Sequence, residues 1–236
     1  ELAWRLHPET RECLARVDGP AMNLWERHPG DEDFLSLRLG LGSVPAAAKI
    51  SYTPRHLQMK EDEYTRLPEQ MAAKYASVED VPLCCELFRD GVCGVIGPRV
   101  QAVELVQSFV AQLTALHSYE EVKLVIVFPK SEYRQWSWMR WLPHCSSAER
   151  DIRYIACTPE DVKEILPPLE TAVKARIASE KEWSFGMNSP TLPHYVFIVA
   201  DSSLLSGSPV IGTAMMMNRP ELGLNGIILG QSLSDF

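Results

Sequence analysis

The stretch GVCGVIGPRVQAVELVQSFVAQLTALHS, residues 91–118, decides the fold class of this chain. Its first part is an apolar run typical of a buried strand, and it ends in a turn formed by Gly97 and Pro98. After the turn, apolar residues recur at helical spacing, and this face consists of Val103, Val106, Val110, Leu113 and Leu116. A strand, a glycine turn and a long helix have the layout of a phosphate-binding loop.

The loop lacks the side chains that bind a nucleotide. In the pattern G-x-x-x-x-G-K-[S/T], backbone N–H groups and the lysine bind phosphates, and the hydroxyl binds magnesium. Aligned from Gly97, this chain has Ala102 for the second glycine, Val103 for the lysine and Glu104 for the hydroxyl residue. A carboxylate a few ångströms from a phosphate costs about 1–4 kcal/mol. Arg99 could compensate in part, but we expect it in the loop rather than at the helix start. We predict a relic site, empty or filled by an anion, that does not use ATP and magnesium.

The rest of the chain alternates between strand and helix patterns. Nearly continuous apolar runs predict further strands at residues 122–128, 151–157, 194–201 and 225–230. Residues 158–181 have a helical pattern, with Thr158 suited to cap the helix and Pro159 to its first position. This alternation predicts an α/β domain with a mostly parallel sheet flanked by helices.

The strand HYVFIVAD, residues 194–201, ends in a second feature of nucleotide-binding folds. In an ATPase, an aspartate at this position holds magnesium and a following acid activates water. Here Ser202 follows Asp201, so the second acid is absent. The loop at residue 97 and Asp201 together favour a RecA-like, P-loop-type fold. The alternatives are a simple strand–turn–helix of another α/β fold and an aspartate that only caps a strand end.

The N-terminal part has a different pattern. Residues 34–42 alternate apolar and polar side chains, which predicts a strand, and residues 46–54 are a candidate for its partner. Residues 82–88 and 91–97 are two apolar runs that we expect to form a hairpin. The domain prediction is an N-terminal helix-plus-strand extension over residues 1–60, packed on a degenerate RecA-like domain over residues 61–236. The C-terminal end of that domain could be truncated.

Composition excludes several classes of protein. The chain has 236 residues, is 46% hydrophobic and carries a net charge of −8. These values allow a full core and argue against a general nucleic-acid surface. The six cysteines form no C-x-x-C pair, which favours reduced thiols inside a cell, and no metal site is evident. No run is apolar enough to span a membrane. Because the chain begins with Glu1, we expect it to be a piece of a larger protein.

Two unusual strings resemble a known family. NLWERHPGDEDFLSLRLGLGSVP, residues 23–45, resembles the segment that follows the transmembrane helices in FtsK/SpoIIIE-type motor proteins of type VII secretion, the EccC/EssC family. WSWMRWLPHC, residues 136–145, resembles that family's W.W..WLPH segment, which follows the second core strand of its first ATPase-like domain. The order of the strings and the degenerate loop between them also match. The resemblance covers about residues 4–230.

The resemblance implies a place and a role. The chain would be the membrane-proximal cytosolic domain, between the membrane helices and the motor domains that carry the functional ATP sites. No catalytic residue carries over, because the matching positions are Val103, Glu104 and Ser202. The expected function is a pseudo-ATPase that couples the membrane-anchored channel to later ATPase domains. Alternatives are a nucleotide-binding switch without hydrolysis, an ATPase with a divergent loop, and a module that binds substrate or a partner.

The resemblance also implies partners. They would be other domains of the same motor protein and other subunits of the secretion complex, on the cytoplasmic side of a bacterial membrane. The parent would be a hexamer and this piece a monomer, without nucleic acid and without inserting into the membrane itself.

Tryptophans are the candidates for an interface. Trp136, Trp138 and Trp141 crowd one short connection, and tryptophan is enriched at interface hot spots. The alternative is that they pack this irregular segment onto the sheet. Trp25 is a further interface candidate that could anchor the membrane-proximal stalk against the α/β core, and the alternative is an ordinary N-terminal packing helix.

Overall fold

The computed structural model describes residues 2–19, 21–53, 63–180, 193–205, 211–212 and 222–232. The chain divides into two compact units, Glu1–His7 with Arg38–Cys84, here the ribbon unit, and Pro8–Leu37 with Cys85–Phe236, here the sheet unit. This division differs from a boundary at residue 60. Phe34, Leu35 and Leu37, which precede residue 60, belong to the core of the sheet unit. The second strand of the ribbon unit, in contrast, comes from residues beyond 60.

The ribbon unit contains helix α1 (Leu2–Leu6), helix α3 (Glu63–Lys74) and most of a two-stranded sheet. Its strands are β1 (Ser36–Pro45) and β2 (Ser77–Glu86). The predicted strand at residues 34–42 is therefore confirmed, but its predicted partner at 46–54 is wrong, since residues 46–53 form no strand and residue 54 lies outside the described residues. An alternating pattern predicts a strand but not its partner. Here the partner is β2, and helix α3 lies between the two strands in the sequence.

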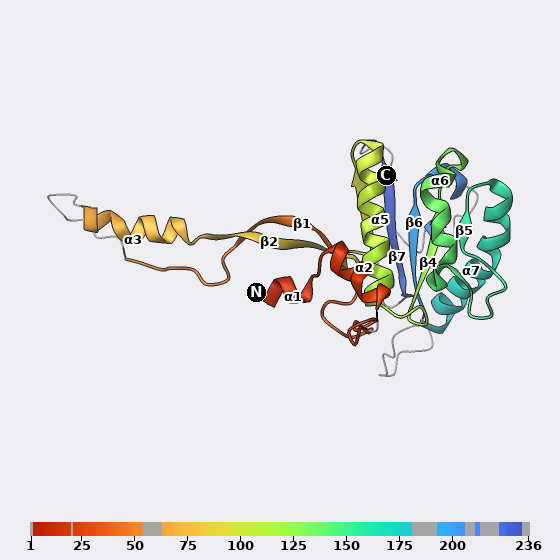
Figure 1. Cartoon of the computed structure of the whole chain (residues 1–236), viewed down its shortest axis with the longest axis horizontal. Helices are drawn as coiled ribbons and strands as arrows, with labels where there is room; N and C mark the ends of the chain where they lie inside the picture. The colour runs from red at the N-terminus through yellow and green to blue at the C-terminus, as the bar shows by residue number, and fades with distance from the viewer. Residues whose placement is uncertain are drawn as a thin grey trace. The chain divides into compact units, whose positions relative to one another are not determined.

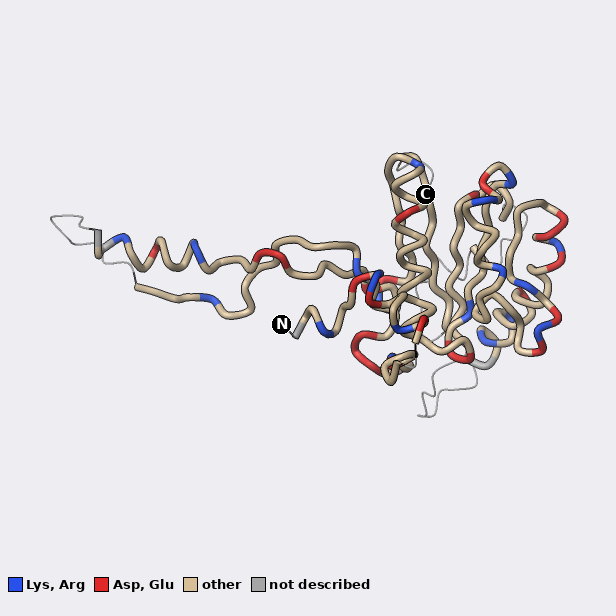
Figure 2. Tube along the Cα trace, in the orientation of Figure 1, with Lys and Arg blue, Asp and Glu red and all other residues tan. Residues whose placement is uncertain are grey.

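The sheet unit is built on five parallel strands in the order β3-β7-β6-β4-β5 (Figure 1). Their bounds are Val92–Ile96 for β3, Val122–Val127 for β4, Ile155–Ala156 for β5, His194–Val199 for β6 and Leu224–Gly230 for β7. The prediction of a parallel α/β sheet is confirmed. Strands β4, β6 and β7 carry one charged residue, Lys123, and Figure 2 shows the other charges of this unit on surrounding helices and loops.

The predicted hairpin of residues 82–88 with 91–97 is wrong. Strand β2 pairs with β1, while β3 pairs in parallel with β7. The short helix α4 (Leu87–Asp90) and Gly91, at φ 74°, turn the chain between the two strands. The Leu87 N–H donates to the Leu35 carbonyl at 3.2 Å, so the chain leaves β2 toward the core rather than doubling back.

Alternate residues of the central strands serve two cores, one on each face of the sheet. Leu124 and Ile126 belong to the core that contains helix α5 (Arg99–Leu116). Val125 and Val127 belong to the core that contains helix α7 (Pro159–Glu180). The two long helices therefore cover opposite faces, and helix α2 (Thr10–Asp18) packs on α5 through Cys13.

The segment after β4 consists of short helical turns. It contains η1 (Lys130–Glu132), α6 (Tyr133–Trp136), η2 (Ser137–Trp141) and η3 (Pro143–Cys145). A further turn, η4 (Ser202–Leu205), follows β6. Among the described helices, none combines the length and apolar character that a membrane span requires.

Candidate functional site

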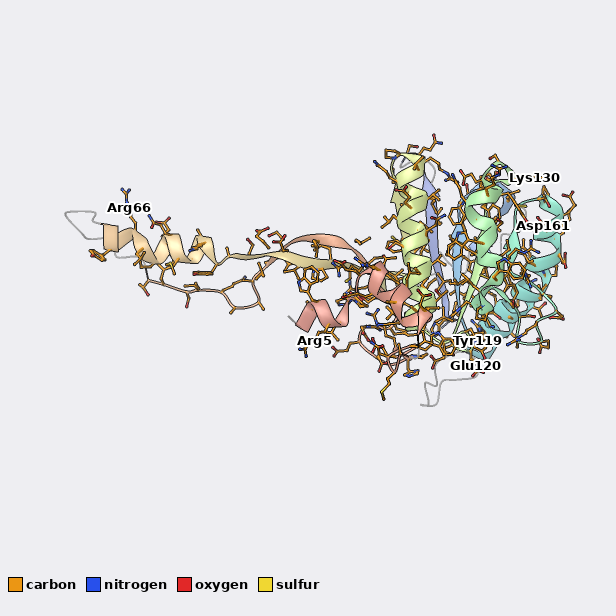
Figure 3. All side chains as sticks on the ribbon, in the orientation of Figure 1. Arg5, Arg66, Tyr119, Glu120, Lys130 and Asp161 are labelled. Atoms are coloured by element: carbon orange, nitrogen blue, oxygen red, sulfur yellow. The ribbon has the colours of Figure 1, made fainter. Side chains whose placement is uncertain are left out.

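An open cavity of about 670 Å³ lies at the carboxyl edge of the parallel sheet. The residues that line it end or follow strands β4, β6 and β7, or begin helix α5; they are Arg99, Pro129, Glu132, Ala200, Asp201, Ser202, Leu229, Gly230, Gln231 and Ser232. Figure 3 labels Lys130 at this end of β4, and Tyr119 and Glu120 at the opposite end. Open parallel sheets bind their ligands at this edge.

The connection from β3 to α5 is much tighter than a phosphate-binding loop. Gly97 and Pro98 alone join the strand to the helix, and the Pro98 carbonyl already accepts the Ala102 N–H at 3.0 Å. Arg99 is the first residue of α5, so the expectation that it lies in a loop away from the helix start is wrong. Pro98 lies at the N-cap, where its ring fixes φ near the observed −55°, and the apolar face that follows packs at once on the sheet.

Arg99 is paired with Glu132. Its Nε lies 2.6 Å from Glu132 Oε1 and its Nη2 lies 2.8 Å from Oε2, the two-pronged geometry that guanidinium groups also use for phosphate. The same Nη2 donates to the Ala200 carbonyl at 2.8 Å. Among the described lining residues, the one guanidinium is thus held by a carboxylate and a backbone carbonyl of the same chain.

The two positions that should bind β/γ-phosphate and magnesium do not reach the cavity. Val103 is buried, with 4% of its surface exposed, and belongs to the core between α5 and the sheet. Glu104 is exposed and is not part of the cavity lining. The repulsion expected between Glu104 and a phosphate therefore does not arise at this cavity. Within the described part of the chain, the carboxylates that do line it are Glu132 and Asp201.

Asp201 follows β6 and stabilises the turn after it. Its Oδ1 accepts the Ser203 N–H at 3.1 Å and the Ser203 hydroxyl at 2.5 Å. This is the capping role that the sequence left open for this residue. Asp201 also lies near Glu132, and its charge opposes in small part the lowering of the Glu132 pKa by Arg99 and Trp136. Asp201 lines the cavity together with Arg99.

The tryptophans of the segment after β4 have different environments. Trp136 is fully buried, stacks on Phe128 with ring centroids 5.9 Å apart, and donates from Nε1 to Glu132 Oε2 at 2.9 Å. It is a core residue with no surface to offer a partner. Trp138 and Trp141 are 41% and 77% exposed.

Trp25 packs within the sheet unit. Its indole donates to the Thr114 carbonyl at 3.0 Å, and its ring meets Tyr119 edge-on with centroids 5.4 Å apart. The side chain is partly buried against the C-terminal end of α5. Packing of the N-terminal segment therefore accounts for its contacts.

Sequence reasoning missed Glu132, the residue that engages Arg99. Glu132 pairs with Arg99 and holds Trp136, but no motif marks it. The available signal was its position shortly after the apolar run 122–128, at the edge where parallel strands end. Gln231 and Ser232 at the end of β7 were missed for the same reason.

Three buried histidines gather elsewhere in the sheet unit. Burial lowers the pKa of His117 to about 3 and that of His144 and His194 to about 4. The His117 Nε2 accepts the Leu35 N–H at 3.1 Å, and the His194 ring packs edge-on against Phe34. Within the described part of the chain, no cluster of histidine, cysteine or acidic residues could hold a metal ion.

Comparison with known proteins identifies the relatives of this chain. No family model matches it. It is 29% identical over 210 residues to the ESX secretion system protein EccC of Geobacillus thermodenitrificans. The matched residues cover 89% of this chain and 14% of that protein. It is 27% identical over 200 residues to the type VII secretion system protein EssC of Staphylococcus aureus strain NCTC 8325, covering 84% of this chain and 14% of that protein. Its homologues are EccC and EssC proteins of type VII secretion. The chain thus spans 14% of the length of these curated relatives.

A solved structure shares the fold. The cytoplasmic domain of the Thermomonospora curvata type VII secretion ATPase EccC is similar with a TM-score of 0.50 and 17% sequence identity, over 89% of this chain and 23% of that one. The five-stranded parallel α/β architecture is therefore shared with an EccC cytoplasmic domain, consistent with a RecA-like fold.

Proposed function

We propose that this chain is a non-catalytic, ATPase-like domain of a type VII secretion motor protein of the EccC/EssC kind. Its homologues are proteins of that system, and its parallel sheet places a cavity where an ATPase of this fold class would hold nucleotide. The domain would lie on the cytoplasmic side of the membrane and couple a membrane-anchored channel to later ATPase domains.

The pairing of Arg99 carries the proposal. A nucleotide site needs cations for the phosphates, and among the described residues that line the cavity Arg99 is the only one. That guanidinium is already engaged by Glu132, and Val103, at the lysine position, is packed in the core. Among the described residues, the side chains at the phosphate-binding positions are thus engaged or buried, which supports the proposal.

A coupling role would act through packed surfaces rather than through a reaction. The partners would be other domains of the same motor protein and other subunits of the secretion complex, with the parent protein assembled as a hexamer. A piece without its anchor and motor domains would be a monomer. The cofactor prediction is that neither ATP nor magnesium is used here.

Titration calorimetry of the purified chain with ATP and magnesium tests the proposal. No saturable heat up to millimolar nucleotide is expected, and no phosphate release above background. One-to-one binding would contradict the proposal. Phosphate release that Asp201→Asn abolishes would establish an ATPase with a divergent loop instead.

The size of the cavity favours a second candidate, a nucleotide-binding switch that does not hydrolyse. A volume of about 670 Å³ is within the range of small-molecule sites. The same titration decides between the two, since a switch requires saturable binding without phosphate release.

The exposure of Trp141 favours a third candidate, a module that binds substrate or a partner. An indole that is 77% exposed resembles an unoccupied hot spot, and Trp138 beside it is 41% exposed. Peptide binding that is lost on Trp138→Ala or Trp141→Ala would favour this candidate over a purely intramolecular role.

A further inference from the structure

The carboxylate of Glu132 pairs with the side chain of Arg99, the first residue of a long helix. Helix α5 spans Arg99–Leu116, and the N–H groups of its first turn have no acceptor within the helix. The N-terminal end of such a helix carries partial positive charge, and anions bind there in many α/β proteins. In this chain Arg99, the first residue of that helix, already holds an anion of the protein itself through its guanidinium, the Glu132 carboxylate.

Glu132 is held in place from two sides. Arg99 engages both carboxylate oxygens, and the buried Trp136 donates to Oε2 at 2.9 Å. Trp136 is itself fixed by stacking on Phe128. Only 17% of the Glu132 side chain is exposed. The carboxylate is therefore anchored on a rigid indole rather than on a freely rotating side chain.

Glu132 stays ionised at neutral pH. Burial raises the pKa of its carboxyl, but the hydrogen bonds from Arg99 and Trp136 outweigh that effect and hold the pKa below its usual range. Asp201, on the same cavity, adds a second carboxylate. Among the described lining residues, the carboxylates thus outnumber the cation, and a phosphate entering the cavity would meet repulsion as well as an occupied guanidinium.

We infer that the Glu132 carboxylate takes the place at Arg99 that a phosphate group would otherwise take. By occupying Arg99 it keeps phosphate-type ligands out of the cavity. This inference rests on the proposed function, because it explains how a fold built for a nucleotide excludes one. In this inference Arg99 is a group that could bind a phosphate. Glu132 competes with the phosphate for Arg99 and keeps it occupied.

Removing the charge of Glu132 tests the inference. Pyrophosphate is the probe, titrated into the whole chain at low salt, because it presents phosphate oxyanions without the base and sugar of a nucleotide. The first variant is Glu132→Gln, which keeps an oxygen for the Trp136 N–H. The second is Glu132→Ala, which also removes the carboxylate and replaces the first variant if that one does not fold. Thermal unfolding followed by circular dichroism establishes that each variant is folded.

Affinity for pyrophosphate should rise by about tenfold or more in both variants, because a competing charge at contact distance is gone. Adding Asp201→Asn should raise it further, and adding Arg99→Gln should abolish it. Glu104→Gln is the matched control, since it removes one carboxylate of the same helix that is exposed and outside the cavity. It should leave the affinity unchanged.

The outcomes separate this inference from the proposed function. If the native chain binds neither ATP nor pyrophosphate and Glu132→Gln also binds neither, the inference is overturned while the non-catalytic proposal stands. A gain in Glu132→Gln that survives Arg99→Gln would also overturn it. If the native chain binds ATP and Glu132→Gln binds it more tightly, the proposed function fails but the competition by Glu132 is supported.

Discussion

Replacing Trp136 by alanine should destabilise the sheet unit strongly. The side chain is fully buried, and an aromatic side chain of this kind buries about 150–250 Å². At about 25 cal/mol per Å² that area corresponds to about 4–6 kcal/mol. Part of it is retained by the alanine methyl, so the expected loss in the free energy of unfolding is about 3–5 kcal/mol, as for other buried tryptophans.

The measurement is urea unfolding followed by far-ultraviolet circular dichroism, with thermal unfolding beside it. For a chain of this size, about 2–4 °C per kcal/mol predicts a fall in Tm of about 6–20 °C. Trp141→Ala is the matched control, because it removes the same side chain from the same segment where it is 77% exposed. Its effect should stay within about 0.5 kcal/mol. If Trp136→Ala costs no more than Trp141→Ala, the assignment of Trp136 to the core is refuted.

Three further changes test other parts of the structure. Arg176 donates to the Pro193 carbonyl at 2.7 Å and to the Leu222 carbonyl at 2.9 Å, so Arg176→Met should lower the urea midpoint by the equivalent of about 1–3 kcal/mol by leaving carbonyls without a donor. Thr158 Oγ1 accepts the Asp161 N–H at 3.2 Å in the cap of α7, and Thr158→Ala should cost about 0.5–2 kcal/mol in the same assay. The folded-state pKa of His194 is about 4, below the unfolded value, so its contribution to stability is present above about pH 6.5 and is lost as the pH falls toward 4. His194→Phe should therefore flatten the decline of the urea midpoint between pH 7 and 5, and an unchanged slope would contradict this.

The parallel sheet was predictable because its strands are buried on both faces. Runs such as residues 122–127 and 194–199 are almost continuously apolar, and a half-exposed strand would alternate instead. The helix after Gly97 was predictable for the corresponding reason, since its apolar spacing continues to Leu116. These features depend on local composition, which a single sequence displays directly.

Pairing of distant segments was not predictable. Residues 36–45 and 77–86 form one ribbon, and nothing in either segment specifies the other. The expected hairpin around Gly91 failed because a four-residue helix and a non-local bond to Leu35 redirect the chain. The candidate site shows the same limit. The motifs single out Arg99 and Asp201 as candidates, but no motif marks Glu132, which the fold brings to Arg99 from 33 positions away in sequence.

The Arg99–Glu132 pair is better explained by what it excludes than by the stability it adds. The side chains are 29% and 17% exposed, and pairs that remain open to solvent contribute about 0–1 kcal/mol. A surface pair of that value would not require a buried indole to orient one partner, yet Trp136 donates to Glu132 from within the core. Rigid placement matters when a group must hold one position against a competitor, because a mobile carboxylate would yield Arg99 to any incoming phosphate. The Arg99 guanidinium would attract an anion in either case, and the fixed Glu132 carboxylate determines which anion it holds.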